Sequence, residues 1–404
     1  MTETQIPWVR SWGAAPQSAH DGLGSLDDHP LFADVTLRQV VRLSGGGRRV
    51  RVRFTNEFGT TPLTIGAARV GFALPGGGVR EGRELTFSGA AAVTVPVGAP
   101  MLSDPVDLPA AALAELSISL HLPDRVETCT CHDPVLDTGW TIPGDAVAAA
   151  VLPPDATVLP VRALISAVDV LPDAPASAVV VVGDSRTDGA GSTPDTHHSW
   201  PELLAARGAG YVVNQGISGN RLLNDGIGTA VLARFDRDVL ATPGLGCVVV
   251  SVGGNDLAVS FAPRDDGPLA GFLEAFPGAP VTAAEVIAGH RQLAARARAH
   301  GVRVYATTIA PFEGAELFTP ECETARQEVN AWIRAGGAFD AVLDFDAVWR
   351  DPDHPSRIRA AYDSGDHLHG SDAGYRALAE SVDLRLFEPA VSSEPADAGA
   401  PARP

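Results

Sequence analysis

The spacing of hydrophobic residues changes in character near the middle of the chain. Over the first 170 residues they recur at every second position, separated by Gly- and Pro-rich turns such as SGGG and LPGGG. The segment RRVRVRF places Val50, Val52 and Phe54 on one face of a strand, and AELSISLHL (114–122) repeats the alternation. Short half-buried strands separated by turns predict an antiparallel, jelly-roll-like β-sandwich.

From residue 179 onward, apolar β-branched runs alternate with segments of helical spacing. The strand candidates are 179–183, 211–216, 247–254, 302–309 and 341–345. The helical segments are SWPELLAAR, TAAEVIAGHRQLAARARAH, ECETARQEVNAWIRA and SDAGYRALAESVDLRLF; the second places Val286, His290, Leu293 and Ala297 on one stripe. Strands this apolar are typical of a parallel sheet covered on both faces. The pattern predicts a doubly wound, three-layer α/β fold, with its functional site beyond the carboxyl ends of the strands.

The two patterns are separated by VLPDAPASA (170–178), whose Pro, Ala and Ser content is that of a linker. We therefore expect an accessory β-sandwich domain over residues 1–170 and an α/β domain over 171–388. The final segment, 389–404, has almost nothing to bury and is predicted to be disordered.

Charge and composition narrow the classes of partner. The 404 residues include 49 acids and 30 Lys or Arg, a formal net charge of −19. Such a surface repels phosphate backbones and anionic lipid, so neither nucleic acid nor a membrane is an expected partner. No apolar run approaches the roughly 20 residues of a membrane span. The start, MTETQIPWVRSWG, lacks the regions of a signal peptide, and four cysteines are too few for a disulfide scaffold, so we expect a cytoplasmic protein.

Four short motifs lie where the predicted strands end or where the last helix begins. They are GDS (183–185), NQGISGNRL (214–222), GGND (253–256) and DHLHGSDAGY (366–375). Each taken singly is an ordinary turn or helix-cap sequence. Together they fall at one end of one parallel sheet, where their side chains can converge.

These motifs supply the groups that acyl transfer requires. A serine hydroxyl becomes a nucleophile when a base removes its proton, which Ser185 and His369 could accomplish. The histidine needs an orienting carboxylate, and Asp366 lies three residues earlier. The developing oxyanion needs preorganised donors. The main-chain amides of Ser185 and Gly219 and the side-chain amide of Asn255 are candidates.

As an ordered set, the four motifs resemble the blocks of the SGNH (GDSL-type) hydrolases, over about residues 175–390. The resemblance implies ester hydrolysis through an acyl-enzyme, without metal or organic cofactor. It assigns Ser185, His369 and Asp366 to the catalytic triad and Ser185, Gly219 and Asn255 to the oxyanion hole. Through SWGAAPQ, TLRQVVRLS and VRVRFTNEFGT, the first half more weakly resembles the β-rich N-terminal domain of some actinobacterial members and some two-domain carbohydrate esterases.

Two residues depart from that family pattern. Arg186 stands where the family has a hydrophobic residue after the serine. This cation either favours an acidic or hydroxyl-rich substrate or pairs with a neighbouring acid. His367 follows Asp366 where glycine is more usual. The D-x-x-H spacing selects His369 as the base, and an Asp366–His367 pair is the less favoured alternative.

Other features are given less weight. CTCH (129–132) could be half of a zinc site, but the remaining cysteines are distant, so a strand-edge coincidence is favoured. His197 and His198 either contact substrate or flank the start of a helix, and the second interpretation is favoured. Asp188 is expected to stabilise a helix N-terminus and Asp256 to order its loop. The insertion 260–281 either walls the acyl pocket or packs against the sandwich.

The sequence therefore predicts a two-domain serine esterase. The family resemblance further implies short-chain carboxylic esters as substrates, such as O-acetyl groups on carbohydrate or another small alcohol. A lipase- or thioesterase-like acyl hydrolase is one alternative, and a carbohydrate-binding protein with an inactive hydrolase fold is another. A phosphate- or nucleotide-binding role ranks low because a Walker lysine and the spaced glycines are lacking. The oligomeric state stays open.

Overall fold

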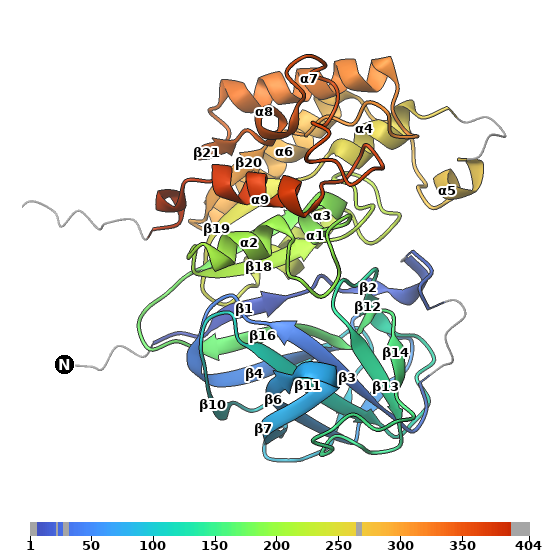
Figure 1. Cartoon of the computed structure of the whole chain (residues 1–404), viewed down its shortest axis with the longest axis vertical. Coiled ribbons are helices and arrows are strands. Elements are labelled where there is room, and N and C mark those ends of the chain that lie inside the picture. The colour runs from blue at the N-terminus through green and yellow to red at the C-terminus, as the bar shows by residue number, and fades with distance from the viewer. Residues whose placement is uncertain (1–5, 22, 27–31, 264–268, 389–404) are drawn as a thin grey trace, which may run out of the picture.

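The computed structural model describes residues 6–21, 23–26, 32–263 and 269–388. The disorder predicted for 389–404 concerns residues outside this set. The chain forms a β-rich half, coloured blue to teal in Figure 1, and an α/β half, coloured green to red.

Two antiparallel sheets make up most of the β-rich half. The first has the order β1 (Val9–Gly13), β16 (Ile165–Leu171), β4 (Gly47–Thr55) and β10 (Val106–Ala110), with β9 (Pro100–Leu102) also on β4. The second has the order β14 (Thr157–Leu159), β13 (Gly139–Pro143), β3 (Val35–Arg42), β11 (Glu115–Leu122), β6 (Ala67–Leu74) and β7 (Gly78–Leu85). Two smaller sheets contain β15 (Arg162–Ala163), β12 (Thr130–His132) and β2 (Gln17–Ser18), and β5 (Leu63–Ile65) with β8 (Val93–Val95).

The alternating hydrophobic residues of these strands form one core. Val50, Val52 and Phe54 of β4 are fully buried, together with the alternating Leu and Ile residues of β11. The opposite face of β11 is buried as well, which its polar residues did not predict. There, Ser119 accepts a hydrogen bond from the Arg38 guanidinium at 3.1 Å, and Arg38 also donates to the carbonyl of Ala149 at 2.6 Å. The loop that contains Ala149 therefore covers this face and accepts hydrogen bonds from Arg38.

The α/β half contains a parallel sheet with the order β18-β17-β19-β20-β21. Its strands are β17 (Ala178–Gly183), β18 (Tyr211–Gly216), β19 (Leu245–Ser251), β20 (Arg303–Thr307) and β21 (Ala341–Leu343). In chain order this is 2-1-3-4-5, the flavodoxin-like arrangement, whose switch point lies between the first and third strands. The last three strands end earlier than the sequence predicted. After β21, for example, the side chain of Asp344 already caps a helix by accepting from Ala347 N.

Helices cover both faces of this sheet, as expected. The helical segments are α1 (Ser185–Asp188), α2 (Trp200–Ala206), α3 (Val231–Phe235), α4 (Gly254–Phe261), α5 (Ala270–Glu274), α6 (Ala283–Ala299), α7 (Pro320–Ala335), α8 (Phe345–Trp349) and α9 (Asp372–Ser381). Apolar residues of α3, α6 and α7 pack on one face, and those of α2, α8 and α9 pack on the other. The predicted stripe of α6 is fully buried, including His290. No helix among the described residues is both long and apolar enough to span a bilayer.

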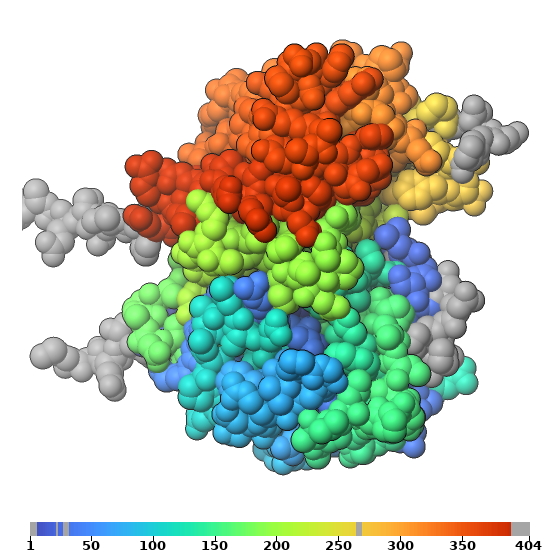
Figure 2. Space-filling view, in the orientation of Figure 1, coloured from blue at the N-terminus to red at the C-terminus, as the bar shows by residue number. Residues whose placement is uncertain are grey.

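The two halves are joined by more than their connecting segment, which runs from 172 to 177 between β16 and β17. Strand β1 lies against β18, and Val9 and Ala15 belong to the same hydrophobic cluster as the parallel sheet. A Cβ atom on Gly13 would lie 2.7 Å from Cγ1 of Val213, so the glycine leaves room for this side chain of β18. Figure 2 shows the halves meeting along a continuous band, with the yellow-green segment around α1 and α2 between the red C-terminal segment and the N-terminal half.

Candidate active site

Ser185 stands at the start of α1, directly beyond the end of β17. Ser185 is only 8% exposed. Asp184 caps the helix, because its side chain accepts a hydrogen bond from the Arg186 amide at 3.1 Å. Burial raises the pKa of Asp184, and the nearby Arg186 cation opposes the rise. As the first helical residue, Ser185 has a main-chain N–H with no acceptor inside its own helix.

The structure brings Ser185, His369 and Asp366 into one hydrogen-bonded chain. Nε2 of His369 lies 2.8 Å from Oγ of Ser185, and Nδ1 lies 2.6 Å from Oδ2 of Asp366. Because a carboxylate only accepts, the ring donates from Nδ1, and Nε2 is left to accept from the serine hydroxyl. This is the tautomer that a general base requires.

Asp366 is held ionised by the loop that carries His369. Its other oxygen accepts from the amides of Leu368 at 2.9 Å and His369 at 2.8 Å, and from the Ser364 hydroxyl at 2.9 Å. Burial acts to raise the pKa of Asp366. The hydrogen bonds from the His369 ring and from these amides outweigh it, and they keep the pKa well below its usual range.

His367 does not pair with Asp366. Its Nδ1 lies 2.6 Å from Oδ2 of Asp363, and its amide donates to the other oxygen of that carboxylate at 3.0 Å. The alternative Asp366–His367 pair is therefore wrong. His367 has a φ of 62°, in the left-handed region that glycine adopts most easily. This conformation explains why glycine suits the position.

The candidate oxyanion donors follow three adjacent strands. Ser185 follows β17, Gly219 follows β18, and Asn255 lies in the first turn of α4 after β19. Gly219 has a φ of 78°, and a Cβ atom there would lie 2.7 Å from Cδ1 of Ile227, so only glycine fits the loop without strain. The Asn255 side-chain amide donates to the main-chain carbonyl of Asn220 at 2.9 Å. This hydrogen bond orients the carboxamide and leaves its second N–H for a ligand.

A small cleft opens beside the serine. It has an empty volume of about 320 Å³ and is lined by Asp184, Ser185, Arg186, Gly254, Asn255, Ala258, Phe312, Leu317 and Leu368. Its apolar wall comes from Ala258, Phe312, Leu317 and Leu368. The described part of the insertion 260–281 does not line it, and Leu273 and Phe276 are buried in the core of this half instead.

Arg186 does not form the ion pair that was one of its two predicted roles, and its effect on substrate preference stays a prediction. Its guanidinium donates to three main-chain carbonyls: Leu368 and Ala310, each at 3.0 Å, and Pro311 at 3.3 Å. It forms no ion pair with an acid among the described residues. Burial lowers the pKa of Arg186, and the charge of Asp184 acts against this. The residue after the serine thus holds the loop that carries His369.

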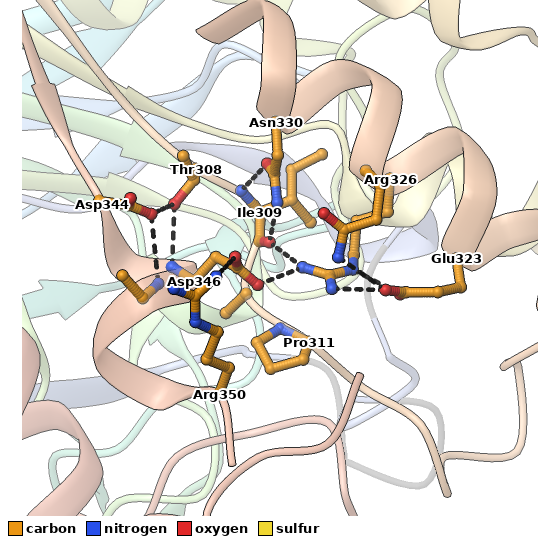
Figure 3. Close-up of polar contacts among 12 residues, drawn as sticks. Thr308, Ile309, Pro311, Glu323, Arg326, Asn330, Asp344, Asp346 and Arg350 are labelled. Carbon is orange, nitrogen blue, oxygen red and sulfur yellow. Dashed lines mark hydrogen bonds and ion pairs between the residues drawn. The ribbon is translucent and has the colours of Figure 1, made fainter. Parts of the chain in front are cut away.

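Two of the carbonyls that accept from Arg186, those of Ala310 and Pro311, directly follow Ile309, which is fixed by the buried polar network shown in Figure 3. Asn330 accepts from the amide of Ile309 at 2.7 Å and donates to its carbonyl at 2.8 Å. Arg326 donates to the same carbonyl and to Asp346, both at 2.6 Å. Sequence reasoning missed this network. The available signal was a pair of polar residues, Arg326 and Asn330, four apart on the apolar stripe of α7.

Arg234 is a second residue that sequence reasoning missed. It is 1% exposed and donates to the carbonyl of Gly183 and to Oδ1 of Asn220, both at 3.1 Å, and to Asp238 at 3.0 Å. It therefore ties the end of β17 to the loop that carries Gly219. Asp238 is four residues away, but Gly183 and Asn220 lie 51 and 14 residues away, at the strand end and on the functional loop.

The sequence predicts structural roles for Asp256 and Asp188, and the structure gives a different result for each. Asp256 orders a loop, but the one after β18 and not its own, because it accepts from the amides of Leu222 at 2.6 Å and Leu223 at 3.0 Å. Burial raises the pKa of Asp256 to about 6, and these amides oppose the rise. The prediction for Asp188 is wrong, because this residue is the last of α1. It accepts from the amide and hydroxyl of Ser218, at 3.2 and 2.6 Å.

The remaining histidine motifs lie away from the cleft beside Ser185. His197 contacts Glu202 and Glu115, both at 3.0 Å, and so joins the two halves of the chain. Burial lowers the pKa of His197, but these carboxylates outweigh it and raise the pKa to about 9. Asp137, His197 and Glu202 bring ligand-type atoms within 4.8 Å of one another. Arg162 already pairs with Asp137 at 3.1 Å, so the group is neutralised by the protein's own cations.

A Ser–His–Asp chain at the carboxyl edge of a 2-1-3-4-5 parallel sheet is the arrangement of a serine hydrolase. The model of the GDSL-like Lipase/Acylhydrolase family matches residues 181–377. This part of the chain belongs to that family, and the protein is a GDSL-type carboxylic ester hydrolase.

Solved structures similar to the chain cover about half of it. A putative lipolytic protein of the G-D-S-L family from Desulfitobacterium hafniense is 23% identical, with a TM-score of 0.38, over 51% of this chain and 97% of its own. A catalytic mutant of an acetylxylan esterase from Geobacillus stearothermophilus is 25% identical, with a TM-score of 0.37, over 52% and 94%. The inhibitor-bound aryl esterase of M. smegmatis is 16% identical, with a TM-score of 0.37, over 52% and 97%. No curated protein sequence gives a significant match.

Proposed function

We propose that the protein is a serine esterase that cleaves short-chain carboxylic esters, with O-acetyl groups on carbohydrate or another small alcohol as the natural class. The observation that carries the proposal is the 2.8 Å contact between Ser185 Oγ and His369 Nε2 beside a small, partly apolar cleft.

The contacts assign a role to each group in the first half-reaction. His369 takes the proton of the Ser185 hydroxyl as Oγ attacks the ester carbonyl, and Asp366 stabilises the imidazolium that forms. The carbonyl oxygen becomes an oxyanion and is stabilised by the amides of Ser185 and Gly219 and by the Asn255 carboxamide. Collapse of this intermediate expels the alcohol, which takes its proton from His369 and leaves an acyl-enzyme on Ser185.

Water then repeats the sequence in the second half-reaction. His369 removes a proton from the water as it attacks the acyl carbon, and the same donors stabilise the second oxyanion. The ester bond to Oγ breaks, the serine recovers its proton from His369, and the carboxylic acid leaves. The net change is the hydrolysis of one ester bond.

The dimensions of the cleft support a short acyl group. Its empty volume of about 320 Å³ includes open solvent, so the enclosed space beside the serine is small. Phe312, Leu317 and Leu368 contribute apolar surface for a methyl or short alkyl chain, whereas a long chain would extend beyond them. This argues against the alternative of a lipase- or thioesterase-like enzyme with long acyl substrates.

A second cleft supports a polar alcohol. It has an empty volume of about 720 Å³ and is lined by His20, Asp21, Asp225, Gly226, Ile227, Gly228, Thr229, Ala275 and Pro277. Ile227 in its wall also packs against Gly219 of the candidate oxyanion loop. Carboxylates and a hydroxyl at this position are suited to hydrogen bonds with the hydroxyl groups of a sugar.

Nitrophenyl esters of increasing chain length test the acyl preference. The expected result is the highest kcat/KM for acetate or propionate and a steep fall by octanoate. A maximum at octanoate would favour the lipase- or thioesterase-like alternative. Acetylated sugars compared with alkyl acetates at equal concentration then test the alcohol, and equal rates would contradict the carbohydrate assignment.

The nucleophile is tested with Ser185→Ala and with an organophosphate. Turnover should disappear in the variant while its melting temperature stays near that of the wild type, and mass spectrometry should locate the phosphorus adduct on Ser185. Ser192→Ala, in the same loop region, serves as the matched control and should keep its activity. Turnover that persists in Ser185→Ala would refute the assignment, and a wild-type chain without any esterase activity would favour the inactive, carbohydrate-binding alternative.

A further inference from the structure

The motif CTCH (129–132) contributes no residue to the cleft beside Ser185, yet its histidine reaches the hydrolase half. His132 lies at the end of β12 in the β-rich half and is 7% exposed. Its Nε2 lies 2.9 Å from Oδ1 of Asp188, the last residue of the helix that begins with Ser185. Its Nδ1 lies 3.0 Å from the carbonyl of Ala15. One imidazole therefore joins β12, the N-terminal segment and α1.

Asp188 passes this contact on to the candidate oxyanion loop. Its Oδ1 faces His132, and its Oδ2 accepts from both the amide and the hydroxyl of Ser218. Ser218 directly precedes Gly219. The side chain of His132 is thus two hydrogen-bonded contacts from the segment that presents the Gly219 amide. The carboxylate between them also belongs to the helix of the nucleophile.

The chemistry of the partners defines the state of the ring. A main-chain carbonyl and a carboxylate both accept hydrogen bonds and donate none, so both ring nitrogens must carry protons for both contacts to form. Burial acts to lower the pKa of His132. The charge and hydrogen bond of Asp188 and the carbonyl of Ala15 outweigh it and raise the pKa above its ordinary value. The contact to Asp188 is therefore charge-assisted and stronger than a neutral hydrogen bond.

We propose that His132 is a positioning residue for ester hydrolysis: it fixes Asp188, which in turn holds Ser218 and the Gly219 amide in place for the oxyanion. The inference rests on the proposed function, and it gives the β-rich half a part in the reaction. His132 contacts neither the serine nor the cleft beside it. Its hydrogen-bonded connection to the oxyanion loop runs through Asp188.

The position of the loop matters because oxyanion stabilisation depends on geometry. A donor that is free to move must be reorganised during the reaction, and a misplacement of about 1 Å can cost roughly 100-fold in rate. The ground-state ester has no oxyanion, so a disordered donor should affect kcat much more than KM. The loss of a contact needed only for folding would not lower kcat while leaving KM unchanged.

The test uses the full chain and three substitutions in the β-rich half. His132→Leu removes both hydrogen bonds, and His132→Gln retains an amide that can donate to Asp188. His121→Leu is the matched control, because His121 pairs with Asp34 at 3.0 Å within the same half. Each variant is measured for kcat and KM on a short-chain nitrophenyl ester, for melting temperature, and for amide hydrogen exchange in peptides covering 217–223.

His132→Leu should lower kcat by roughly 10- to 100-fold, leave KM nearly unchanged, and speed exchange in the 217–223 peptides. His132→Gln should recover most of the activity, and His121→Leu should behave as the wild type. The double variant His132→Leu/Asp188→Asn should be little worse than Asp188→Asn alone, because residues that act through one contact are not additive.

Two results would overturn the positioning role. One is unchanged exchange in 217–223 for His132→Leu, and the other is faster exchange with an unchanged kcat. The exchange measurement also separates this inference from the proposed function. If the wild-type chain cleaves no ester, the proposed function fails, and faster exchange in the variant would still support the contact that orders the loop.

Discussion

The guanidinium of Arg186 donates to the carbonyl of Leu368 at a distance of 3.0 Å, so the residue after the candidate nucleophile holds the residue before the candidate base. Ser185 and His369 are 184 positions apart in the chain, and their contact depends on how two separate loops are docked. Arg186 links these loops directly. The carbonyls of Ala310 and Pro311, which also accept from Arg186, connect both loops to the network around Arg326.

Replacing Arg186 should therefore impair catalysis and stability together. We expect Arg186→Met to lower kcat by about 10-fold or more, because the His369 loop loses its anchor. It should also lower the urea midpoint of unfolding, because three buried carbonyls lose their donor. Arg186→Lys should be intermediate, since an ammonium cannot reproduce the planar fork. Arg385→Met, at an exposed position, is the control; wild-type kcat in Arg186→Met would contradict the anchoring role.

The two Asp–His pairs of the last loop permit a matched comparison. Asp366→Asn should reduce kcat by roughly 10³- to 10⁴-fold, because a neutral amide can present an N–H to the ring and select the wrong tautomer. Asp363→Asn, beside His367, should leave kcat near the wild-type value. Both asparagines keep an oxygen for the loop amides, so the comparison isolates the carboxylate. Equal losses in the two variants would show that loop order, and not the His369 tautomer, limits the rate.

Substitutions at Gly219 and Gly208 should show whether a loss of kcat comes from the position of the glycine or from backbone strain alone. Gly219→Ala places a Cβ atom against Ile227 in a left-handed conformation, so the loop must shift; we expect kcat to fall by about 10²-fold, as for the loss of one oxyanion donor. Gly208→Ala has a comparable positive φ of 96° with open space around it. Gly219→Ala should lose more stability in urea unfolding than Gly208→Ala, because only its Cβ atom meets a neighbouring side chain. A similar loss of kcat in Gly208→Ala would remove the case for a special role of Gly219.

Acid stability should depend on His290, which is buried in α6 and hydrogen-bonded to the Val252 carbonyl at 3.1 Å. Burial lowers its pKa from 6.5 to about 4, although that carbonyl acts in the opposite direction. Between these values the unfolded chain binds more protons than the folded protein, so stability falls as the pH drops from about 6.5 to about 4. The loss should approach about 3 kcal/mol at the lower end.

His290→Gln removes this titration and should flatten the pH dependence of the unfolding free energy over that window. Asp256, whose pKa is raised to about 6, changes stability with the opposite sign, so the variant must be compared with the wild type at each pH. His300→Gln, at the exposed end of α6, controls for the loss of an imidazole. Parallel curves for His290→Gln and wild type would exclude His290 as the source.

The placement of Ser185, Asn255 and His369 could be anticipated because it follows from short-range rules. Apolar β-branched runs identify parallel strands, and the ends of such strands meet at one edge. The D-x-x-H spacing likewise brings a carboxylate and an imidazole together within a single turn of loop. In each case the relevant partner is local, or lies at a strand end whose position the topology fixes.

The roles of Arg186, Arg234 and Arg326 could not be anticipated in the same way. Each donates to main-chain carbonyls, and a carbonyl is present at every residue, so the acceptor leaves no trace in the sequence. His132 shows a related difficulty: its motif is interpreted as a strand-edge coincidence, with half a zinc site as the less favoured alternative, whereas its partner is a carboxylate in the other half of the chain. Pattern analysis finds residues of unusual chemistry, but the fold decides which distant group they meet.

Val9 and Ala15 pack within the hydrophobic cluster of the parallel sheet, and this has a consequence for truncating the chain. Excising the hydrolase from residue 178 onward would uncover a stripe around Val213 and Ile217 and invite aggregation, even though the cut falls in a loop. An engineered minimal enzyme should instead carry residues 9–15 along, for instance as a grafted strand on a circularly permuted chain.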